Sequence, residues 1–194
     1  MRPIIPVAVG LLALGLSTSG CDYERPTPEK TATKKESPAP GVGQTEANSV
    51  DIWTPAALGD VKLLELRLSQ APDVDALDPT FGATALALAA DFGKPDAVRA
   101  CLAAGADVNA LNKNRSSPAL GAAFFGRAEC LRILLEAGAD PDLADESGTT
   151  TFTALAVPWE ITKLIADMMG MPVDQAMVEQ GRDECERILE SHEG

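Results

Sequence analysis

Apolar residues in the middle of the chain follow the spacing of two short helices separated by a glycine turn. The segment Leu86–Ala90 repeats apolar side chains three and four positions apart, and the segment Val98–Leu102 does the same farther on. Thr84 stands where it can cap the first helix, and Gly93 stands between the two apolar segments. Gly105 is placed to end the second helix in the left-handed conformation. The pattern therefore predicts a helix-turn-helix unit followed by an extended segment.

The same pattern returns at a sequence offset of 33. Gly93 and Gly105 fall on Gly126 and Gly138, and the alanine pair at 89–90 falls on a second pair at 122–123. A fixed period of this length indicates a repeat architecture. Because one unit cannot bury its apolar face alone, the units are expected to stack and to share a continuous core.

Weaker copies flank the two strong repeats. Upstream, the offset from Gly59 to Gly93 is 34 instead of 33, which places one extra residue in the connection. Downstream, a fourth copy opens at Asp145, and a segment starting at Gly181 echoes the one starting at Gly126. The expected units span 52–77, 78–111, 112–144, 145–173 and a truncated 174–191, which together make one domain over 52–191.

The repeat resembles the ankyrin repeat, since the glycine offsets, the alanine pair and the Gly-Ala-Asp run after the second helix agree twice. This resemblance implies an all-α solenoid of stacked helix-turn-helix units with short extended connections, here called fingers. It also implies binding of another protein through the fingertips and the concave face of the first helices. It implies no enzymatic activity.

The segment 1–20 is predicted to be a signal peptide. An apolar run extends from Ile4 to Leu16, which is shorter than the roughly 20 residues that a membrane-spanning helix needs and suits a secretory signal. Cys21 follows a small residue, as in the lipobox of bacterial lipoproteins, although Thr18 stands where that motif usually has leucine. The alternatives are cleavage near Gly20 with an incidental cysteine, or a buried N-terminal helix. Lipidation of Cys21 implies an exported protein anchored in the cell envelope.

Residues 21–51 are predicted to be a disordered linker, because prolines interrupt a polar stretch without apolar periodicity. The charge lies beyond this linker. Residues 1–50 carry five acidic and five basic residues, whereas residues 51–194 carry 24 and 11, so the net charge of −13 belongs to the repeats. Such a surface repels nucleic acid and anionic lipid headgroups. It favours a protein partner with a basic patch, and membrane contact only through the lipid anchor.

The residues that catalysis or metal binding would need are scarce. His192 is the only histidine, and neither a phosphate-binding loop nor a zinc-protease motif is present. The acidic finger that includes Asp145 lacks the glycine and glutamate of a calcium loop. We therefore predict no catalytic, cofactor or metal site. Three cysteines are expected to be free, buried thiols, because their repeat positions place them too far apart for a disulfide: Cys101, Cys130 and Cys185.

Candidate partner-binding residues lie at the fingertips and just before the turn glycines. Phe92 and Phe125 are separated by the repeat offset of 33, so they should be neighbours on one face, where they either anchor a partner or pack as core. Arg115 replaces a finger glycine, which indicates either a contact or an altered turn. The full set is Phe81, Asp91, Phe92, Asn114, Arg115, Phe125, Asp145 and Glu146.

Two functions fit this organisation. The first is a membrane-tethered module outside the cytoplasm that binds another protein through its concave and finger face. The second is a structural or self-associating envelope protein whose concave face meets a second copy. An enzyme or a small-ligand receptor is disfavoured by the missing histidines and phosphate loops.

Overall fold

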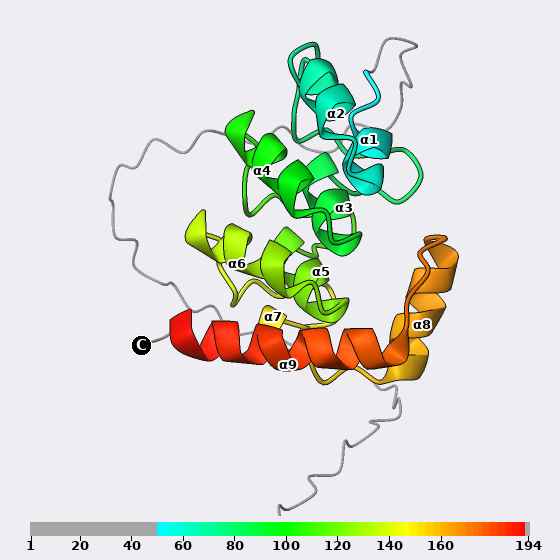
Figure 1. The fold of residues 1–194 in the computed structure, drawn as a ribbon, viewed down its shortest axis with the longest axis vertical. Helices are drawn as coiled ribbons and strands as arrows, with labels where there is room; N and C mark the ends of the chain where they lie inside the picture. The colour runs from blue at the N-terminus through cyan, green and yellow to red at the C-terminus, as the bar shows by residue number, and fades with distance from the viewer. Residues whose placement is uncertain (1–49, 193–194) are drawn as a thin grey trace, which may run out of the picture. The chain divides into compact units, whose positions relative to one another are not determined.

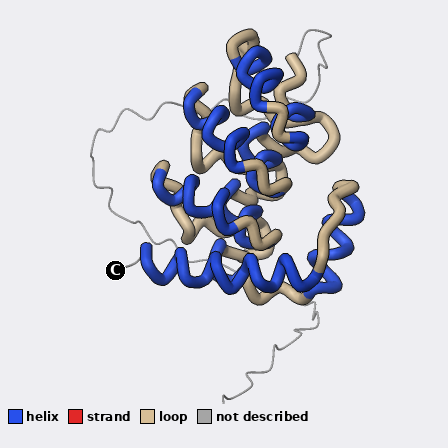
Figure 2. The backbone as a smooth tube through the Cα atoms, viewed as in Figure 1, coloured by secondary structure: helices blue, strands red, loops and turns tan. Residues whose placement is uncertain are grey.

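The computed structural model describes residues 50–192, which form helices joined by turns and loops, with no strand in that range (Figure 2). The predicted signal peptide, Cys21 and the linker up to residue 49 lie outside the described residues. The helices are α1 (Trp53–Leu58), α2 (Val61–Leu68), α3 (Ala85–Asp91), α4 (Pro95–Ala103), α5 (Pro118–Phe124), α6 (Ala128–Glu136), α7 (Thr151–Ala154), α8 (Trp159–Met168) and α9 (Gln175–His192).

Local signals start and end the helices as the repeat pattern predicts. The Thr84 hydroxyl accepts a hydrogen bond from the Ala87 amide at 3.1 Å, and Ser117 caps α5 in the same way. Gly93 and Gly105 have φ values of 64° and 90°, so each adopts the left-handed conformation that turns the chain after a helix. The caps and the turn glycines therefore fold each unit into an antiparallel helix pair.

The units stack so that their helices form two rows (Figure 1). The inner row consists of α1, α3, α5 and α7, and each of these helices contacts the next. The outer row begins with α2, α4 and α6. Alanines fill the interfaces of the inner row, and their small side chains let the helix backbones approach closely; those with no exposed surface include Ala56, Ala85, Ala89, Ala90, Ala119, Ala122, Ala123 and Ala154.

The last outer helix is α9, and this position differs from the expected division of the C-terminal part. The sequence indicated a fourth unit over 145–173 and a truncated fifth over 174–191. In the structure α9 packs along α6, as the first helix of the fourth unit, α7, packs along α5. The offset from Gly126 to Gly181 is 55 instead of 33. The fourth unit is thus α7 followed by α9, with an insertion between them that contains α8.

Equivalent arginines confirm this position for α9. Arg127, which follows a turn glycine, donates from Nε to the Asp91 carbonyl oxygen of the preceding unit at 3.0 Å. Arg182 donates from Nε to the Phe124 carbonyl oxygen at 3.0 Å, and Phe124 lies one repeat period after Asp91. A Cβ on Gly181 would overlap the backbone of the turn after α5, so only glycine permits this close approach of α9.

Candidate functional site

Three finger turns project between the units, and each is closed by an aspartate or asparagine. The Asp78 carboxylate accepts hydrogen bonds from the amides of Thr80, Phe81 and Ala83 at 2.8–2.9 Å. Asn112 closes the second finger through amide donors two and four residues farther on, and Asp145 closes the third in the same way. These three side chains therefore stabilise the finger turns through hydrogen bonds to the turns' own backbone amides.

The fingers also bind one another through the backbone. The Lys113 amide donates to the Gly82 carbonyl oxygen at 2.8 Å, and the Glu146 amide donates to the Asn114 carbonyl oxygen at 3.2 Å. The first finger contains the extra residue that the upstream offset of 34 predicts, since Asp78 and Gly82 are four positions apart whereas Asp145 and Gly148 are three apart. Successive fingertips therefore form one continuous edge of the stack.

Arg115 has the backbone conformation of a glycine. Its φ value is 62°, and the equivalent residues of the neighbouring fingers, Gly82 and Gly148, have φ values of 65° and 81°. Arg115 is the one non-glycine residue with positive φ in the part of the chain that the structure describes. The turn is therefore not altered by the arginine, and the left-handed conformation strains it by roughly 1–2 kcal/mol. Its side chain is exposed and makes no ion pair with any described residue.

The fingertip candidates divide into exposed and structural residues. Phe81, Asn114, Arg115 and Glu146 are exposed. Asp145 is half-buried, and its Oδ1 already accepts hydrogen bonds from Ser147 and Thr149. Partial burial raises the pKa of Asp145, but these hydrogen bonds outweigh it and hold the pKa below its usual range. Asp145 thus shapes its own finger, and the exposed four form the finger edge available to a partner.

Phe92 and Phe125 are neighbours, as their spacing predicts, but the insertion covers them. Phe125 is only 3% exposed and packs with Ala166 of α8 and with Met171. Phe92 is half-buried beside the same cluster. Phe125 therefore corresponds to the core alternative, which corrects its assignment as a surface contact. The physical reason is that α8 and the residues after it occupy the end of the inner helices.

Asp91 lies at the end of α3 with its carboxylate against the backbone of Gly121 on α5. It is half-buried and makes no side-chain hydrogen bond among the described residues. Burial raises the pKa of Asp91 to about 7, and the nearby Arg127 guanidinium opposes this rise. Asp91 therefore lies in the packing between two units. Its repeat position instead predicts an exposed residue that contacts a partner.

Arg182 is a central residue that sequence reasoning did not single out. It is 8% exposed, and its guanidinium donates to the carbonyl oxygens of Phe124 and Val157 and to the Thr162 hydroxyl at 2.6–3.0 Å. The guanidinium also lies 5.6 Å from the centre of the Phe124 ring. One side chain therefore joins α5, α8 and α9. The available signal was the Gly-Arg pair at 181–182, which matches the pair at 126–127.

The three cysteines are free and buried, which confirms the prediction. Burial raises the pKa of the Cys101 and Cys185 thiols to about 12 and that of Cys130 to about 11, so these thiols stay protonated at neutral pH. Within residues 50–192, no group of three or more His, Cys, Asp or Glu side chains is placed to hold a metal ion. No helix in that range is long and apolar enough to cross a membrane.

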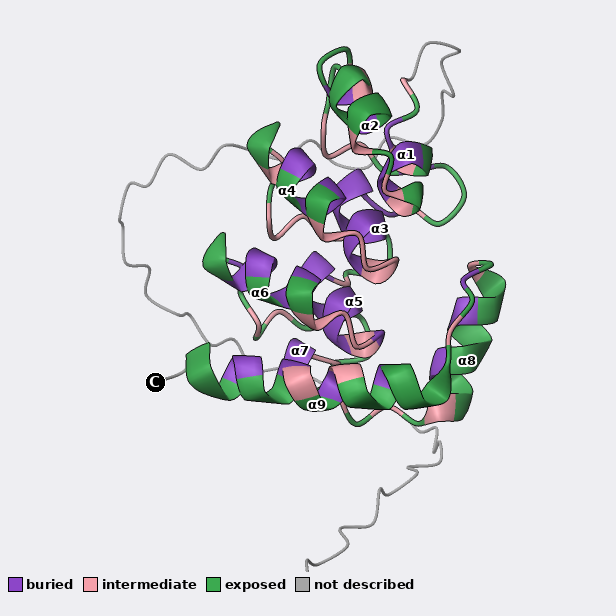
Figure 3. Ribbon diagram, in the orientation of Figure 1, coloured by how far each residue is buried: buried purple, intermediate pink, exposed green. Residues whose placement is uncertain are grey.

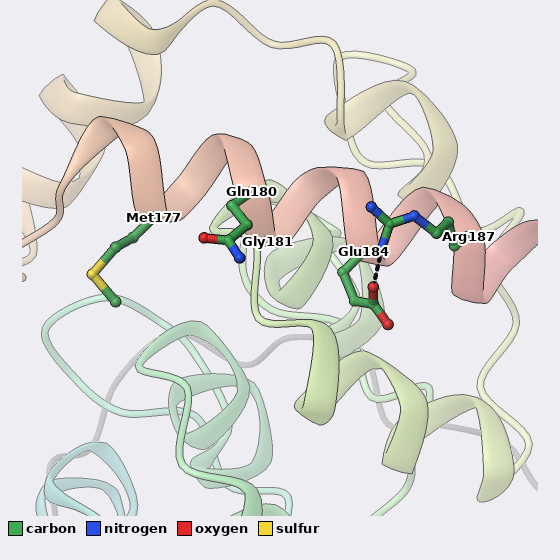
Figure 4. Close-up of a pocket in the computed structure, with 5 residues that line it drawn as sticks. All are labelled: Met177, Gln180, Gly181, Glu184 and Arg187. Atoms are coloured by element: carbon green, nitrogen blue, oxygen red, sulfur yellow. Dashed lines mark hydrogen bonds and ion pairs between the residues drawn. The ribbon is translucent and has the colours of Figure 1, made fainter.

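A surface depression is present along one flank of α9 (Figure 4). All of its lining residues belong to that one helix, and the ion pair between Glu184 and Arg187 lies at one end: Met177, Gln180, Gly181, Glu184 and Arg187. No second element closes the depression, so it lacks the enclosing walls of a small-molecule site.

Comparison with known families identifies the repeats. The sequence model of the family described as ankyrin repeats, in three copies, matches residues 55–145, from α1 to the start of the third finger. No curated protein matches the sequence. Ankyrin repeats are generally non-catalytic modules that bind other proteins. The family match shows that residues 55–145 are ankyrin repeats, and the all-helical stack of the described residues has the fold class of an all-α ankyrin solenoid.

Proposed function

We propose that this chain is an exported, membrane-tethered module that binds a partner protein through the finger edge. The supporting observation is Arg115, an exposed arginine that holds a strained backbone conformation where both neighbouring fingers have glycine. Glycine would satisfy the fold with less strain. Residues held in strained conformations concentrate at binding and catalytic sites.

The finger edge offers side chains of several kinds to a partner. Phe81 is 40% exposed and supplies an aromatic surface, Asn114 supplies an amide, and Arg115 and Glu146 supply opposite charges. The excess of acidic residues over positions 51–194 favours a partner whose surrounding surface is basic. Association with such a partner should slow as added salt screens the charges.

Arg115→Gly tests the finger edge. We expect this variant to be equally or more stable, by about 0.5–1 kcal/mol, because relief of strain exceeds the added entropy of the unfolded chain. We expect it to recover less of the partner when the variant and the unaltered chain are compared as crosslinked baits in the envelope fraction. Lys62→Ala on α2 is the control, since it removes an exposed cation that lies on a helix and is 53 positions from Arg115. Equal recovery by Arg115→Gly and Lys62→Ala would contradict the proposal.

The signal-like run from Ile4 to Leu16 and the cysteine that follows it support export and anchoring. Stable membrane attachment by lipid requires two or more acyl chains, as a mature lipoprotein carries. Cys21→Ser should therefore move the protein from the membrane fraction to the soluble fraction. Unchanged membrane association of Cys21→Ser would exclude a lipid anchor at this residue.

A further inference from the structure

Helix α8 has a wider apolar surface than the stack covers. Thr162 and Ala166 are buried and face the stack, and Met169 just beyond the helix lies on the same side. Figure 3 shows the corresponding side of α8 as buried and the opposite side as exposed. The exposed side includes four large apolar residues at positions i, i+3, i+4 and i+7, which are Ile161, Leu164, Ile165 and Met168.

These four residues share one face of the helix, which we call the outer face of α8. A helix turns by about 100° per residue, so they lie within one sector, which is flanked by the buried sector on one side and by the charged sector on the other. The charged sector holds Glu160, Lys163 and Asp167, and the distance from Lys163 Nζ to Asp167 Oδ2 is 2.6 Å. The four residues are between 36% and 74% exposed. Such a contiguous apolar stripe on a soluble domain marks an interaction surface.

Residues of the stack hold α8 in place on its other side. Arg182 donates hydrogen bonds to the Val157 carbonyl oxygen before α8 and to the Thr162 hydroxyl within it. Ala166 packs on Phe125. A helix fixed on one face presents its outer face without a large ordering cost, which favours binding.

Methionine is concentrated in the same region. Apart from Met1, every methionine of the chain lies between residues 168 and 177. Met168 is 74% exposed and belongs to the outer face itself. Because methionine side chains are flexible and polarizable, they suit surfaces that adapt to an apolar partner.

We propose that the outer face of α8 docks the apolar side of an amphipathic helix from the partner protein, and that this helix carries lysine or arginine beside its apolar residues. This inference rests on the proposed function and adds a second contact to the finger edge. The charge of the chain selects the occupant: 24 acidic against 11 basic residues over positions 51–194 attract a basic helix and repel a second copy of the chain. Leu164 and Met168, the most exposed of the four, would provide the anchors.

The test uses the full chain and a labelled synthetic helix of about five turns, built from leucine and lysine, with fluorescence anisotropy as the readout. We expect saturable binding that weakens with salt and falls at least about tenfold in Leu164→Ser and in Met168→Ser. Leu66→Ser is the matched control, because Leu66 is exposed to a similar extent on α2. Circular dichroism checks that all three variants keep their helices. Equal loss in all three variants, or no binding at all, would overturn the proposal.

Four further measurements test the role of charge and the other occupants. Equally tight binding of the same helix with glutamate in place of lysine would overturn the role of charge. Dimers in sedimentation that Leu164→Ser dissociates would assign the outer face to a second copy instead. Tighter binding of zwitterionic vesicles, or of a peptide of residues 4–16, would assign it to a membrane or to the chain's own N-terminal segment. The Arg115→Gly experiment is independent, so the finger edge can stand if α8 fails.

Discussion

Removal of the Arg182 guanidinium should destabilise the C-terminal end of the stack more than any exposed substitution on α9. Arg182→Ala deletes hydrogen bonds to two carbonyl oxygens and one hydroxyl, of residues Phe124, Val157 and Thr162. Each unsatisfied buried acceptor costs about 1–3 kcal/mol. After the deletion, water can solvate some of these acceptors. We therefore expect the free energy of unfolding to fall by about 3–5 kcal/mol in total, which is within the range for loss of a buried charged partner.

Urea unfolding followed by far-UV circular dichroism measures this loss. Arg187→Ala is the matched control on the same helix: its side chain is 66% exposed and pairs only with Glu184, so the change should cost less than about 0.5 kcal/mol. Arg127→Ala should fall between the two, because Arg127 makes one backbone hydrogen bond and a contact with the Met171 sulfur. A cost for Arg182→Ala within about 1 kcal/mol of the Arg187→Ala cost would refute the structural role assigned to Arg182.

Five other substitutions test the packing of the stack. Gly181→Ala should cost about 1–3 kcal/mol of stability, because the added Cβ meets backbone atoms. At Gly138 an added Cβ meets nothing, so Gly138→Ala should show only the cost of the left-handed conformation. Denaturant unfolding of both variants measures the two costs. Because Asp91 has a raised pKa in the folded state, it holds its proton to higher pH than in the unfolded chain, so its contribution to stability is lost as pH rises from about 4 to about 7. A rise of about three pKa units corresponds to roughly 4 kcal/mol of pH dependence, and Asp91→Asn should remove most of it. Equal slopes of stability against pH for the variant and the unaltered chain between pH 5 and pH 8 would exclude this role of Asp91. Leu135→Ala should cost about 2–5 kcal/mol of stability, and Leu102→Ala should cost less, because Leu135 is 4% exposed whereas Leu102 is half-buried. The midpoints of thermal unfolding of the two variants test this order.

The sequence predicted the fold class because the signals for it are local. Thr84 and Ser117 cap helices through amides only three residues away. Gly93 and Gly105 turn the chain through their own dihedral angles. The repeat period then requires that similar units stack, and the family match over residues 55–145 agrees with that interpretation.

The finger edge was only partly accessible to sequence reasoning. The positions of Phe81, Asn114 and Glu146 follow from the period alone, and the structure exposes all three. For Arg115 the sequence left two alternatives, and the φ value of 62° excludes the altered turn. Asp145 shows the limit, because a carboxylate at a fingertip can either face solvent or close the turn, and only the coordinates show that it accepts hydrogen bonds from its own finger.

The tertiary structure alone decided how the C-terminal residues complete the stack. Helical periodicity identifies α8 and α9 as helices, but it does not determine which neighbour each one packs against. That choice depends on contacts between residues far apart in sequence, such as the hydrogen bonds from Arg182 to Phe124, 58 positions away. The same contacts place the insertion over Phe125, whose burial therefore follows from the position of α8 and not from its own place in the repeat. A local pattern specifies the unit, whereas long-range packing specifies which surfaces the finished stack leaves exposed.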